Sequence, residues 1–313
     1  MSYYIGIDGG GTKTAFALFN EKKEILFEHK GPGSNHENLE SSFDGASDII
    51  IEGVTALCEK AGISLECVDY TLMGLAGIDH TYQHDEMAKR LTAKGLKNFS
   101  IYNDGFIVVK AGSQTGAAIG YNCGTGVCCN AVDSEGKMLQ LAGLGDFTGD
   151  FCGGVWIAGQ TFRLIYDDIY AMGEKTVLSE KAFKTFNLKS REEFLALVAK
   201  LEDENNDDYI RPFLDIFFEA VEEGDKPALG IVELMSDRGA LFISALAKQM
   251  KFDGDEIEVV LSGSINVKLA NPFYIKLLKE KAQKLSPKKL KFIELKSAPV
   301  TGCINWIMQE YIK

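Results

Sequence analysis

The stretch Ile5-Gly6-Ile7-Asp8-Gly9-Gly10-Gly11-Thr12-Lys13-Thr14 carries the strongest signal for the fold of this chain. Two short β-rich runs, Tyr3–Asp8 and Thr14–Phe19, flank its glycines, which predicts a β-hairpin with a glycine-rich turn. Glycine permits positive φ angles and lets a phosphate approach the main chain without a Cβ clash. The turn therefore presents backbone N–H groups, Thr12 and Lys13 as candidate phosphate contacts.

The residue before the glycines supports the same interpretation. Asp8 ends the first strand, where its carboxylate is placed to hold Mg²⁺ through water. The alternative is a plain hairpin with a generous turn. Three consecutive glycines lose a great deal of backbone entropy on folding, which makes that alternative less attractive.

The order of the predicted elements repeats along the chain. The first copy comprises, in order, three strands, a helix, a strand, a helix, a strand and a helix: Tyr3–Asp8, Thr14–Phe19, Ile25–His29, Asn38–Ala61, Tyr70–Leu75, Asp85–Lys94, Phe99–Tyr102 and a helix from Asp104. The second copy has the same order with added helices: Gly116–Gly120, Val127–Val132, Met138–Leu141, a helix from Gly153, a helical stretch Ser179–Lys251, Ile257–Leu261, a helix capped by Asn271, Lys291–Leu295 and Val300–Ile312. Two copies of βββαβαβα predict two similar α/β domains that face each other, the second with helical inserts.

Two further glycine turns follow apolar strands. Asn122-Cys123-Gly124-Thr125-Gly126 occupies the hairpin position of the second copy, so the two hairpins could hold one triphosphate from opposite sides. Leu261-Ser262-Gly263-Ser264-Ile265 follows a later strand. A nucleoside or its ribose could lie against it, and an ordinary strand–helix connection is the alternative.

Composition excludes several other classes of protein. The formal charge is 33 − 45 = −12, without a basic stripe, so we expect no nucleic-acid partner. No apolar run is long enough to cross a bilayer, and Met1-Ser2-Tyr3-Tyr4 leads straight into a strand instead of a signal peptide. The seven cysteines include no C-x-x-C pair, which is typical of reduced, buried thiols. We therefore expect a cytoplasmic protein.

The turns, in this order, resemble those of the actin-like ATPase and sugar-kinase superfamily over nearly the whole chain. Six segments resemble the N-acetylglucosamine kinase branch of the BadF/BadG/BcrA/BcrD-type ATPase family: Asp8 to Thr14, Asn103-Asp104-Gly105, Gly124-Thr125-Gly126, Gly149-Asp150, Trp156-Ile157-Ala158 and Leu261-Ser262-Gly263-Ser264. The resemblance implies two actin-like (ribonuclease H-like) domains, 1–113 and 114–298, with a helical insert at about 175–250 in the second. The final helix, 299–313, would pack back on the first domain, and a hinge would lie near Ala111–Gln114.

The same resemblance implies an ATP-dependent kinase that uses Mg²⁺. It would phosphorylate a hydroxyl, the 6-hydroxyl first, of an N-acetylated amino sugar. N-acetylglucosamine is the first choice, while N-acetylmuramic acid, glucosamine and glucose stay open. The oligomeric state cannot be read from the sequence, although a homodimer is compatible with the family.

Roles for individual residues also come from the resemblance. Asp8 would organise the metal and Asp104 would be the catalytic base for the sugar hydroxyl. The ATP contacts would be Gly9, Gly10, Gly11, Thr12, Lys13, Gly124, Thr125 and Gly126 around the phosphates, with Gly263 and Ser264 beside the adenosine. The sugar contacts would be Asn35, Gly77, Asp104, Gly145 and Asp150.

Two of these assignments have structural alternatives. Asp104 stands at the start of a predicted helix and Asp150 shortly before another, and capping a helix N-terminus is a common role for aspartate. The chain also departs from the family pattern, with Phe151 in place of an acidic residue, Val127 and Cys128 in place of small residues, and Ala76 in place of serine. These departures leave the identity of the sugar open.

Two other functions stay open. One is an ATPase that activates a reductase or dehydratase through an iron–sulfur cluster, because Cys123 stands beside the second glycine turn; a convincing second ligand is missing. The other is a non-catalytic sugar-binding ATPase or an actin-like filament protein, which would not need a base at Asp104.

Overall fold

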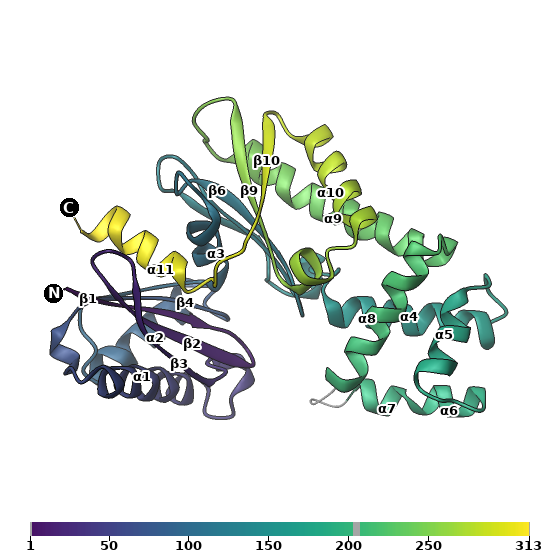
Figure 1. Cartoon of the computed structure of the whole chain (residues 1–313), viewed down its shortest axis with the longest axis horizontal. Helices are drawn as coiled ribbons and strands as arrows, with labels where there is room; N and C mark the ends of the chain where they lie inside the picture. The colour runs from purple at the N-terminus through teal and green to yellow at the C-terminus, as the bar shows by residue number, and fades with distance from the viewer. Residues whose placement is uncertain (1, 203–206, 313) are drawn as a thin grey trace.

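Two five-stranded mixed sheets with the same topology form the framework of the protein (Figure 1). The computed structural model describes residues 2–202 and 207–312. The first sheet has the order β3-β2-β1-β4-β5, with bounds β1 Tyr3–Gly9, β2 Lys13–Asn20, β3 Ile25–Pro32, β4 Val68–Leu75 and β5 Phe99–Tyr102. The second has the order β10-β9-β6-β7-β8, with bounds β6 Ala118–Cys123, β7 Val127–Val132, β8 Met138–Ala142, β9 Glu256–Ser262 and β10 Lys289–Glu294.

The pairing directions confirm the repeat that the element order predicts. In each copy the first three strands form antiparallel pairs, and the fourth strand pairs parallel with the first. The fifth strand then pairs parallel with the fourth. Parallel neighbours require a crossover, and the helices between the strands supply it.

Helices cover both faces of the sheets. Those of the first copy are α1 Ser42–Ala61, α2 Thr81–Ala93 and α3 Asp104–Gly112, with short turns η1 His36–Asn38 and η2 Leu65–Cys67. Those of the second are α4 Gly154–Ile169, α5 Val177–Thr185, α6 Arg191–Ala196, α7 Val198–Leu201, α8 Asp207–Glu222, α9 Lys226–Gln249, α10 Pro272–Leu285 and α11 Thr301–Trp306, with η3 Asp146–Thr148, η4 Ile265–Leu269 and η5 Ile307–Tyr311. Helices α4 to α8 project away from the second sheet, to the right in Figure 1.

Two helix starts differ from the sequence prediction, and side-chain caps explain both. The helix predicted from Asn38 begins at Ser42, because the Asn35 side chain caps the separate short turn η1. The helix predicted from Asp85 begins at Thr81, because the Gln83 side chain accepts hydrogen bonds from the N–H groups of Asp79 and His80, both at 2.8 Å.

Helix α3 lies between the two sheets and is buried on nearly all sides. Its residues 105–110 are all buried, a pattern typical of a helix inside a core. The approach is close on both sides: a Cβ on Gly74 of β4 would lie 2.8 Å from Ile107, and one on Gly120 of β6 would lie 3.0 Å from Val109. Glycine at these positions lets the helix touch both sheets at once.

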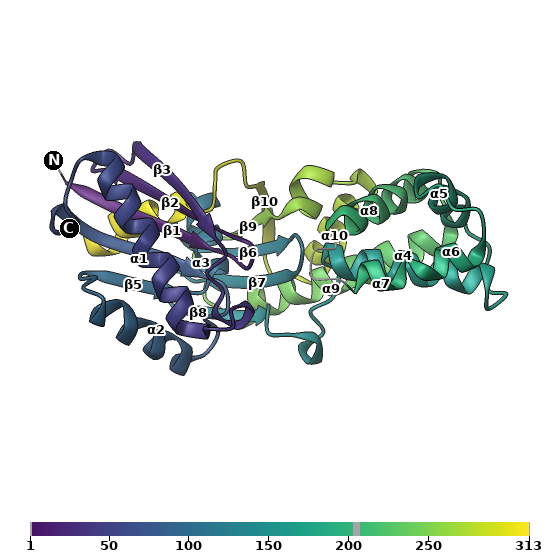
Figure 2. The ribbon, with the colours of Figure 1, turned by 90° about the horizontal axis from the view of Figure 1, so that it is seen from below.

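The other helices complete the layers. Helices α1 and α2 cover the opposite face of the first sheet (Figure 2), and α9 and α10 cover the opposite face of the second. Helix α11 contacts α3 and β1, and its Trp306 stacks on Tyr102 at 4.0 Å between ring centroids. The domain limits 1–113 and 114–298 and the hinge stay predictions.

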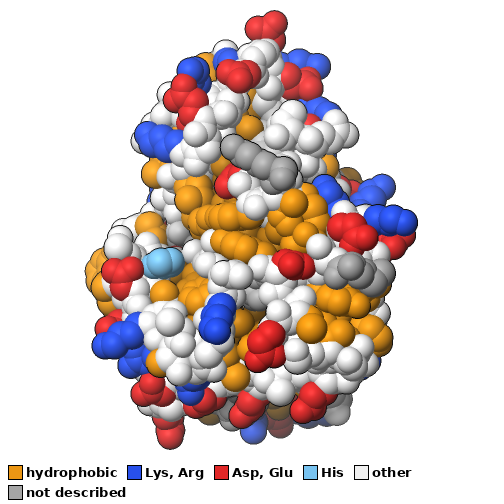
Figure 3. Space-filling model, turned by 90° about the vertical axis from the view of Figure 1, so that its left-hand side faces the viewer, with side chains coloured by type: hydrophobic (Ala, Val, Ile, Leu, Met, Phe, Trp, Pro, Cys, Tyr) orange, Lys and Arg blue, Asp and Glu red, His pale blue; other side chains and the backbone are white. Residues whose placement is uncertain are grey.

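Three features bear on possible partners: the distribution of charge on the surface, the length and polarity of the helices, and the state of the cysteines. On the face that Figure 3 shows, Lys and Arg side chains stand singly or in small groups among acidic ones, without a continuous basic area. Within residues 2–202 and 207–312, the helices are too short or too polar to cross a membrane. All seven cysteines have free thiols, and six of the seven are at least partly buried.

Truncation of Trp306 tests the contact that returns the C-terminal helix to the first domain. The side chain is 1% exposed, so Trp306→Ala should lower the free energy of unfolding by about 3–5 kcal/mol, which urea unfolding measures. Leu241→Ala, at a side chain that is 47% exposed on a helix, is the control and should cost about 1 kcal/mol or less. Equal losses in the two variants would contradict the packing role of α11.

Candidate functional site

The glycine turns of the two copies meet at one cavity. The cavity has a volume of about 540 Å³ and lies between the β1–β2 turn and the β6–β7 turn. Its lining includes Asp8, Gly10, Gly11, Thr12, Lys13, Asn35, Gly77, Asp104, Thr125 and Gly126 from the predicted set. It also includes Ala15, Glu37, Ala76, Asp79, Asn122, Val127, Cys128 and Gly143. Segments more than 100 residues apart in sequence therefore face one ligand-sized space.

Four backbone N–H groups in these turns have no protein acceptor. Within the described residues, the amides of Gly11, Thr12, Thr125 and Gly126 donate no hydrogen bond to the protein. All four residues are exposed and line the cavity. Backbone N–H groups on opposite sides of one space form a natural site for an anion such as a phosphate chain.

The first turn also fixes the neighbouring loop. Gly10 donates its N–H to the Lys13 carbonyl at 3.0 Å, while the Gly10 carbonyl accepts from the amides of Ser34 and Asn35 at 3.0 and 3.3 Å. Asn35 is thereby held at the cavity beside Gly77, where a Cβ would lie 2.3 Å from the Asn35 Oδ1 atom. Gly77 has φ +77°, a conformation that favours glycine.

Asp104 is the first residue of α3 and lies half-buried at the cavity. The helix N-cap is its neighbour Asn103, whose Oδ1 accepts from the Gly105 N–H at 2.9 Å. The capping alternative for Asp104 is therefore wrong, and its carboxylate is left to face the cavity. Burial and the charges of Asp8 and Asp79 raise the pKa of Asp104 to about 7. A carboxylate with this pKa can accept a proton at neutral pH.

Asp79 joins the two sheets beside Asp104. Its Oδ1 accepts from Asn103 Nδ2 at 2.9 Å and from Gln140 Nε2, on β8 of the second sheet, at 2.8 Å. Asn130 of β7 donates to Asn103 Oδ1 at 3.2 Å. This chain of polar side chains links the cap of α3 to the second domain.

The cavity carries an excess of negative charge. Four carboxylates line it, from Asp8, Glu37, Asp79 and Asp104, and Lys13 is the one Lys or Arg in the described lining. Burial raises the pKa of Asp8 to about 6, an effect that Lys13 partly offsets. Oxygen donors of this kind suit Mg²⁺, which binds proteins through one or two carboxylates and keeps several waters. Asp8, which lines the cavity beside the first glycine turn, fits that role. A bound cation would offset the charge of a polyphosphate, which the carboxylates would otherwise repel.

Comparison with known proteins agrees with this geometry. A family model described as the BadF/BadG/BcrA/BcrD ATPase family matches residues 5–293. The chain belongs to this family. A relative from Clostridium acetobutylicum, named N-acetylmuramic acid/N-acetylglucosamine kinase, is 24% identical over 307 residues, 97% of each chain. A relative from Dictyostelium discoideum, named N-acetyl-D-glucosamine kinase, is 25% identical over 268 residues, 81% of this chain and 82% of its own.

Solved structures share the fold of this BadF/BadG/BcrA/BcrD family member. A protein from Chromobacterium violaceum, provisionally assigned as an N-acetylglucosamine kinase, has a TM-score of 0.70 at 18% identity and 99% coverage of both chains. A ROK family glucokinase from Streptomyces griseus, solved with glucose and AMPPNP, has a TM-score of 0.54 at 17% identity and 97% coverage of both chains. The two-domain actin-like fold expected from the sequence is thereby confirmed.

Several predicted contacts of the BadF/BadG/BcrA/BcrD site lie behind or beside the cavity. Gly9 lies within β1, under the loop at Ser34. The third turn packs behind the second: a Cβ on Gly124 would lie 3.7 Å from both Gly263 Cα and Ser264 N. Gly145 lines a smaller adjoining cavity of about 250 Å³, which shares Glu37, Asp79 and Gly143 with the first.

Asp150 faces the main chain of its own loop instead of the cavity. Its Oδ2 accepts from the N–H groups of Gly143, Leu144 and Gly145, at 2.9 Å for Gly143 and 2.7 Å for Gly145. The capping alternative is wrong here too, because the N-cap of α4 is Gly153. Asp150 thus shapes the loop that lines both cavities, and its predicted sugar contact stays a prediction.

The departures from the family pattern separate into two groups. Ala76, Val127 and Cys128 line the cavity and can act on the ligand directly. Phe151 lies outside the described lining and stacks on Trp156 at 5.1 Å between ring centroids, with the Arg238 guanidinium 5.6 Å from its ring. The residue at position 151 therefore packs against its own domain.

Glu37, Asp79 and Gln140 were missed by sequence reasoning. Asp79 follows the carboxyl end of β4, where ligand-binding side chains collect in parallel sheets, so that rule could have found it. Glu37 directly follows the Gly33-Ser34-Asn35-His36 segment. Gln140 carries no sequence signal, because its contact depends on how the two domains face each other.

The structure does not place Cys123 where an iron–sulfur cluster could bind. Its side chain is fully buried, its thiol donates to the Cys152 carbonyl at 3.1 Å, and burial raises its pKa to about 12. Within residues 2–202 and 207–312, His, Cys, Asp and Glu form no group of three or more that could hold a metal ion directly.

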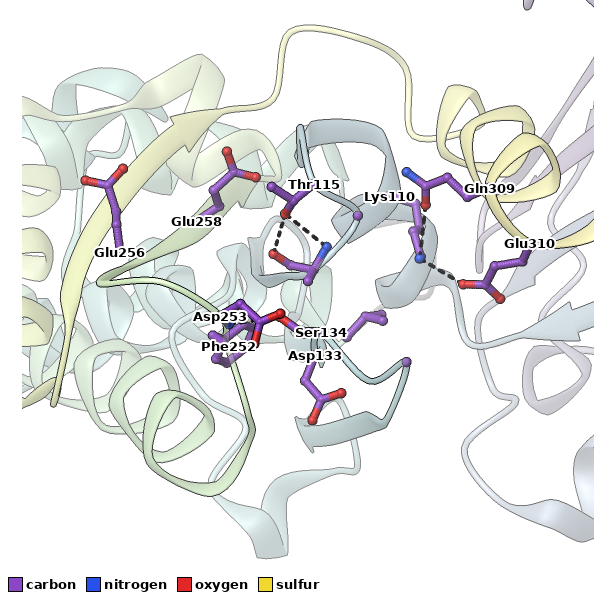
Figure 4. Close-up of a pocket in the computed structure, with 14 residues that line it drawn as sticks. Lys110, Thr115, Asp133, Ser134, Phe252, Asp253, Glu256, Glu258, Gln309 and Glu310 are labelled. Atoms are coloured by element: carbon purple, nitrogen blue, oxygen red, sulfur yellow. Dashed lines mark hydrogen bonds and ion pairs between the residues drawn. The ribbon is translucent and has the colours of Figure 1, made fainter.

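A separate cavity of about 480 Å³ lies at the connection between the domains (Figure 4). None of the predicted site residues lines it. Lys110 at its edge donates to Gln309 at 3.2 Å and pairs with Glu310 at 3.1 Å, while Glu258 accepts from Ser113 and from the Gln114 N–H. These contacts hold the segment between Lys110 and Gln114 in place.

Removal of the Asp104 charge should stabilise the fold at high pH. The folded-state pKa of about 7 lies above the ordinary 3.8, so the carboxylate disfavours the folded state progressively as the pH rises from about 4 to about 7. Without Mg²⁺ or nucleotide, Asp104→Asn should raise the Tm by a few degrees at pH 8 and by less at pH 5. Thermal unfolding at both pH values measures this.

Asp255→Asn, at an exposed aspartate, is the matched control and should leave the Tm nearly unchanged. If Asp104→Asn changed the Tm by the same amount at both pH values, burial would not raise the pKa of the Asp104 carboxylate.

Proposed function

We propose that this chain is an ATP-dependent kinase that phosphorylates a hydroxyl of an N-acetylated amino sugar, with N-acetylglucosamine as the first choice. The observation that carries the proposal is the shared cavity. It brings unpaired backbone N–H groups from both domains together with a carboxylate whose pKa is about 7. The names of both relatives include N-acetylglucosamine, and the name of the Clostridium acetobutylicum relative also includes N-acetylmuramic acid.

Phosphoryl transfer depends mainly on positioning and charge neutralisation. Gly11, Thr12, Thr125 and Gly126 would bind the phosphate oxygens through their N–H groups, and Lys13 would add a positive charge. Gly263 and Ser264, behind Gly124, would border the adenosine. Mg²⁺ held by Asp8, when bound, would offset the charge of the β- and γ-phosphates.

The acceptor sugar would lie between the same turns and α3. Asn35 and Gly77 would contact it, and Asp150 would act on it through the Gly143–Gly145 loop. Asp104 would accept the proton of the attacking hydroxyl, the 6-hydroxyl in this proposal, as its oxygen bonds to the γ-phosphorus and the bond between that phosphorus and ADP breaks. Asn103, held by Asp79 and Asn130, fixes the N-terminus of α3 and with it the direction of this carboxylate.

An ADP-release assay tests the function directly. Purified protein with ATP and Mg²⁺ should release ADP only when an amino sugar is added, and EDTA should abolish the release. A panel of N-acetylglucosamine, N-acetylmuramic acid, glucosamine and glucose would rank the acceptors. Sugar-independent ADP release, or none with any sugar, would favour an activating ATPase or a non-catalytic sugar-binding protein.

Asp104→Asn should separate catalysis from folding. The amide keeps the size of the side chain but cannot accept the hydroxyl proton, so kcat should fall by about 10³-fold with N-acetylglucosamine while the protein stays folded. Nucleotide affinity, measured by calorimetry, should change little, because the phosphate contacts come from the two turns. Turnover close to that of the unchanged protein would show that another group is the base.

A further inference from the structure

The adjoining cavity offers room for a substituent on the sugar. It has a volume of about 250 Å³ and opens beside the candidate sugar contacts, sharing Glu37, Asp79 and Gly143 with the main cavity. Tyr82 on one domain and Leu144 on the other line it, and their side chains are 60% and 42% exposed. A ring substituent larger than a hydroxyl would therefore meet space here, so size alone does not select the acceptor.

The charged side chains around the adjoining cavity include two carboxylates, those of Asp79 and Glu37. Asp79 uses Oδ1 to accept two hydrogen bonds, which holds its carboxylate at the junction of the two cavities. Glu37 lies two residues after Asn35, and its Oε1 accepts from Gln83 Nε2 at 3.3 Å. Both carboxylates line both cavities. Burial raises the pKa of Asp79, and the charge of Glu37 adds a smaller effect in the same direction.

Cations are placed elsewhere. Among the described lining residues of both cavities, Lys13 is the one Lys or Arg, and it lies in the phosphate turn next to Asp8. The guanidinium of Arg238 donates to the carbonyls of Thr148 and Gly149 and lies over the Phe242 ring. His80 also lines the adjoining cavity.

We infer that this site selects amino sugars without a negative charge, and that Glu37 is a specificity-determining residue that acts against a carboxylate on the sugar. The inference rests on the proposed function and narrows its substrate class. N-acetylmuramic acid, with its lactyl carboxylate, would enter a space lined by two acids. N-acetylglucosamine lacks that group and meets the same hydrogen-bonding residues without the repulsion.

A neutral derivative separates charge from size. The probes are N-acetylglucosamine, N-acetylmuramic acid and the methyl ester of N-acetylmuramic acid, each assayed for kcat/KM by ADP release. We expect N-acetylmuramic acid to be at least about 10-fold poorer than N-acetylglucosamine, and its ester to recover several-fold. Higher ionic strength should narrow the gap between acid and ester, because salt screens repulsion at a partly exposed site.

Single-residue variants test whether Glu37 causes the discrimination against N-acetylmuramic acid. Glu37→Gln should improve kcat/KM for N-acetylmuramic acid relative to N-acetylglucosamine by about 3–10-fold, and Glu37→Lys should improve it further. Glu40→Gln removes the same charge from an exposed position outside both cavities and should leave the ratio unchanged. Since Glu37 is exposed, all three variants should fold, which a thermal unfolding scan checks.

Each outcome has one meaning. Equal turnover of N-acetylmuramic acid and N-acetylglucosamine would overturn the inference and leave the kinase function intact. An ester as poor as the acid would overturn it in favour of size selection. A ratio that Glu40→Gln shifts as much as Glu37→Gln would show that net charge, not this residue, decides. If no sugar supports ADP release, the proposed function fails, and the inference with it.

Discussion

The burial of helix α3 between two sheets is the constraint on which the site depends. The helix contacts β4 on one side and β6 and β7 on the other, and close approaches at Gly74 and Gly120 hold it there. Its first residue, Asp104, therefore stands at the boundary of the two domains and cannot turn away without disturbing both cores. Asn103 caps the helix end, while Asp104, the next residue, lines the cavity.

Charge balance explains how one cavity could treat two ligands differently. Four carboxylates surround a space whose strongest fixed donors for an anion are backbone N–H groups. A phosphate chain fits only where those N–H groups and a divalent cation offset its charge. The other side of the space has acids without that compensation, which is why we propose that it binds the uncharged hydroxyls of a sugar. Burial, with the charges of Asp8 and Asp79 adding to it, raises the pKa of Asp104 to about 7.

Local patterns in the sequence predicted the framework well. The order of strands and helices and the two glycine turns follow from short-range periodicity, and the strand pairing confirmed both. The direction in which individual side chains point was harder to predict from the sequence. Asn103, not Asp104, caps α3, a difference of one residue that depends on backbone geometry at the helix start. Asp150 bonds to its own loop because three amides converge on it, and nothing in its sequence spacing indicates that convergence.

The individual side-chain contacts that complete the site could not be predicted from the sequence, although the meeting of the two glycine turns was. Asp79 meets Gln140 only because the two sheets face each other at one angle, and Glu37 joins the cavity only because the first turn holds its loop.

The central claim is that turns from both domains bind one nucleotide. Titration of ¹⁵N-glycine-labelled protein with Mg²⁺ and AMPPNP, followed by TROSY NMR, measures it most directly. We expect the Gly11 and Gly126 amide signals to shift together with a single Kd, while those of Gly224 and Gly254, in exposed turns elsewhere, stay in place. Shifts in one turn alone, or different Kd values for the two, would contradict it.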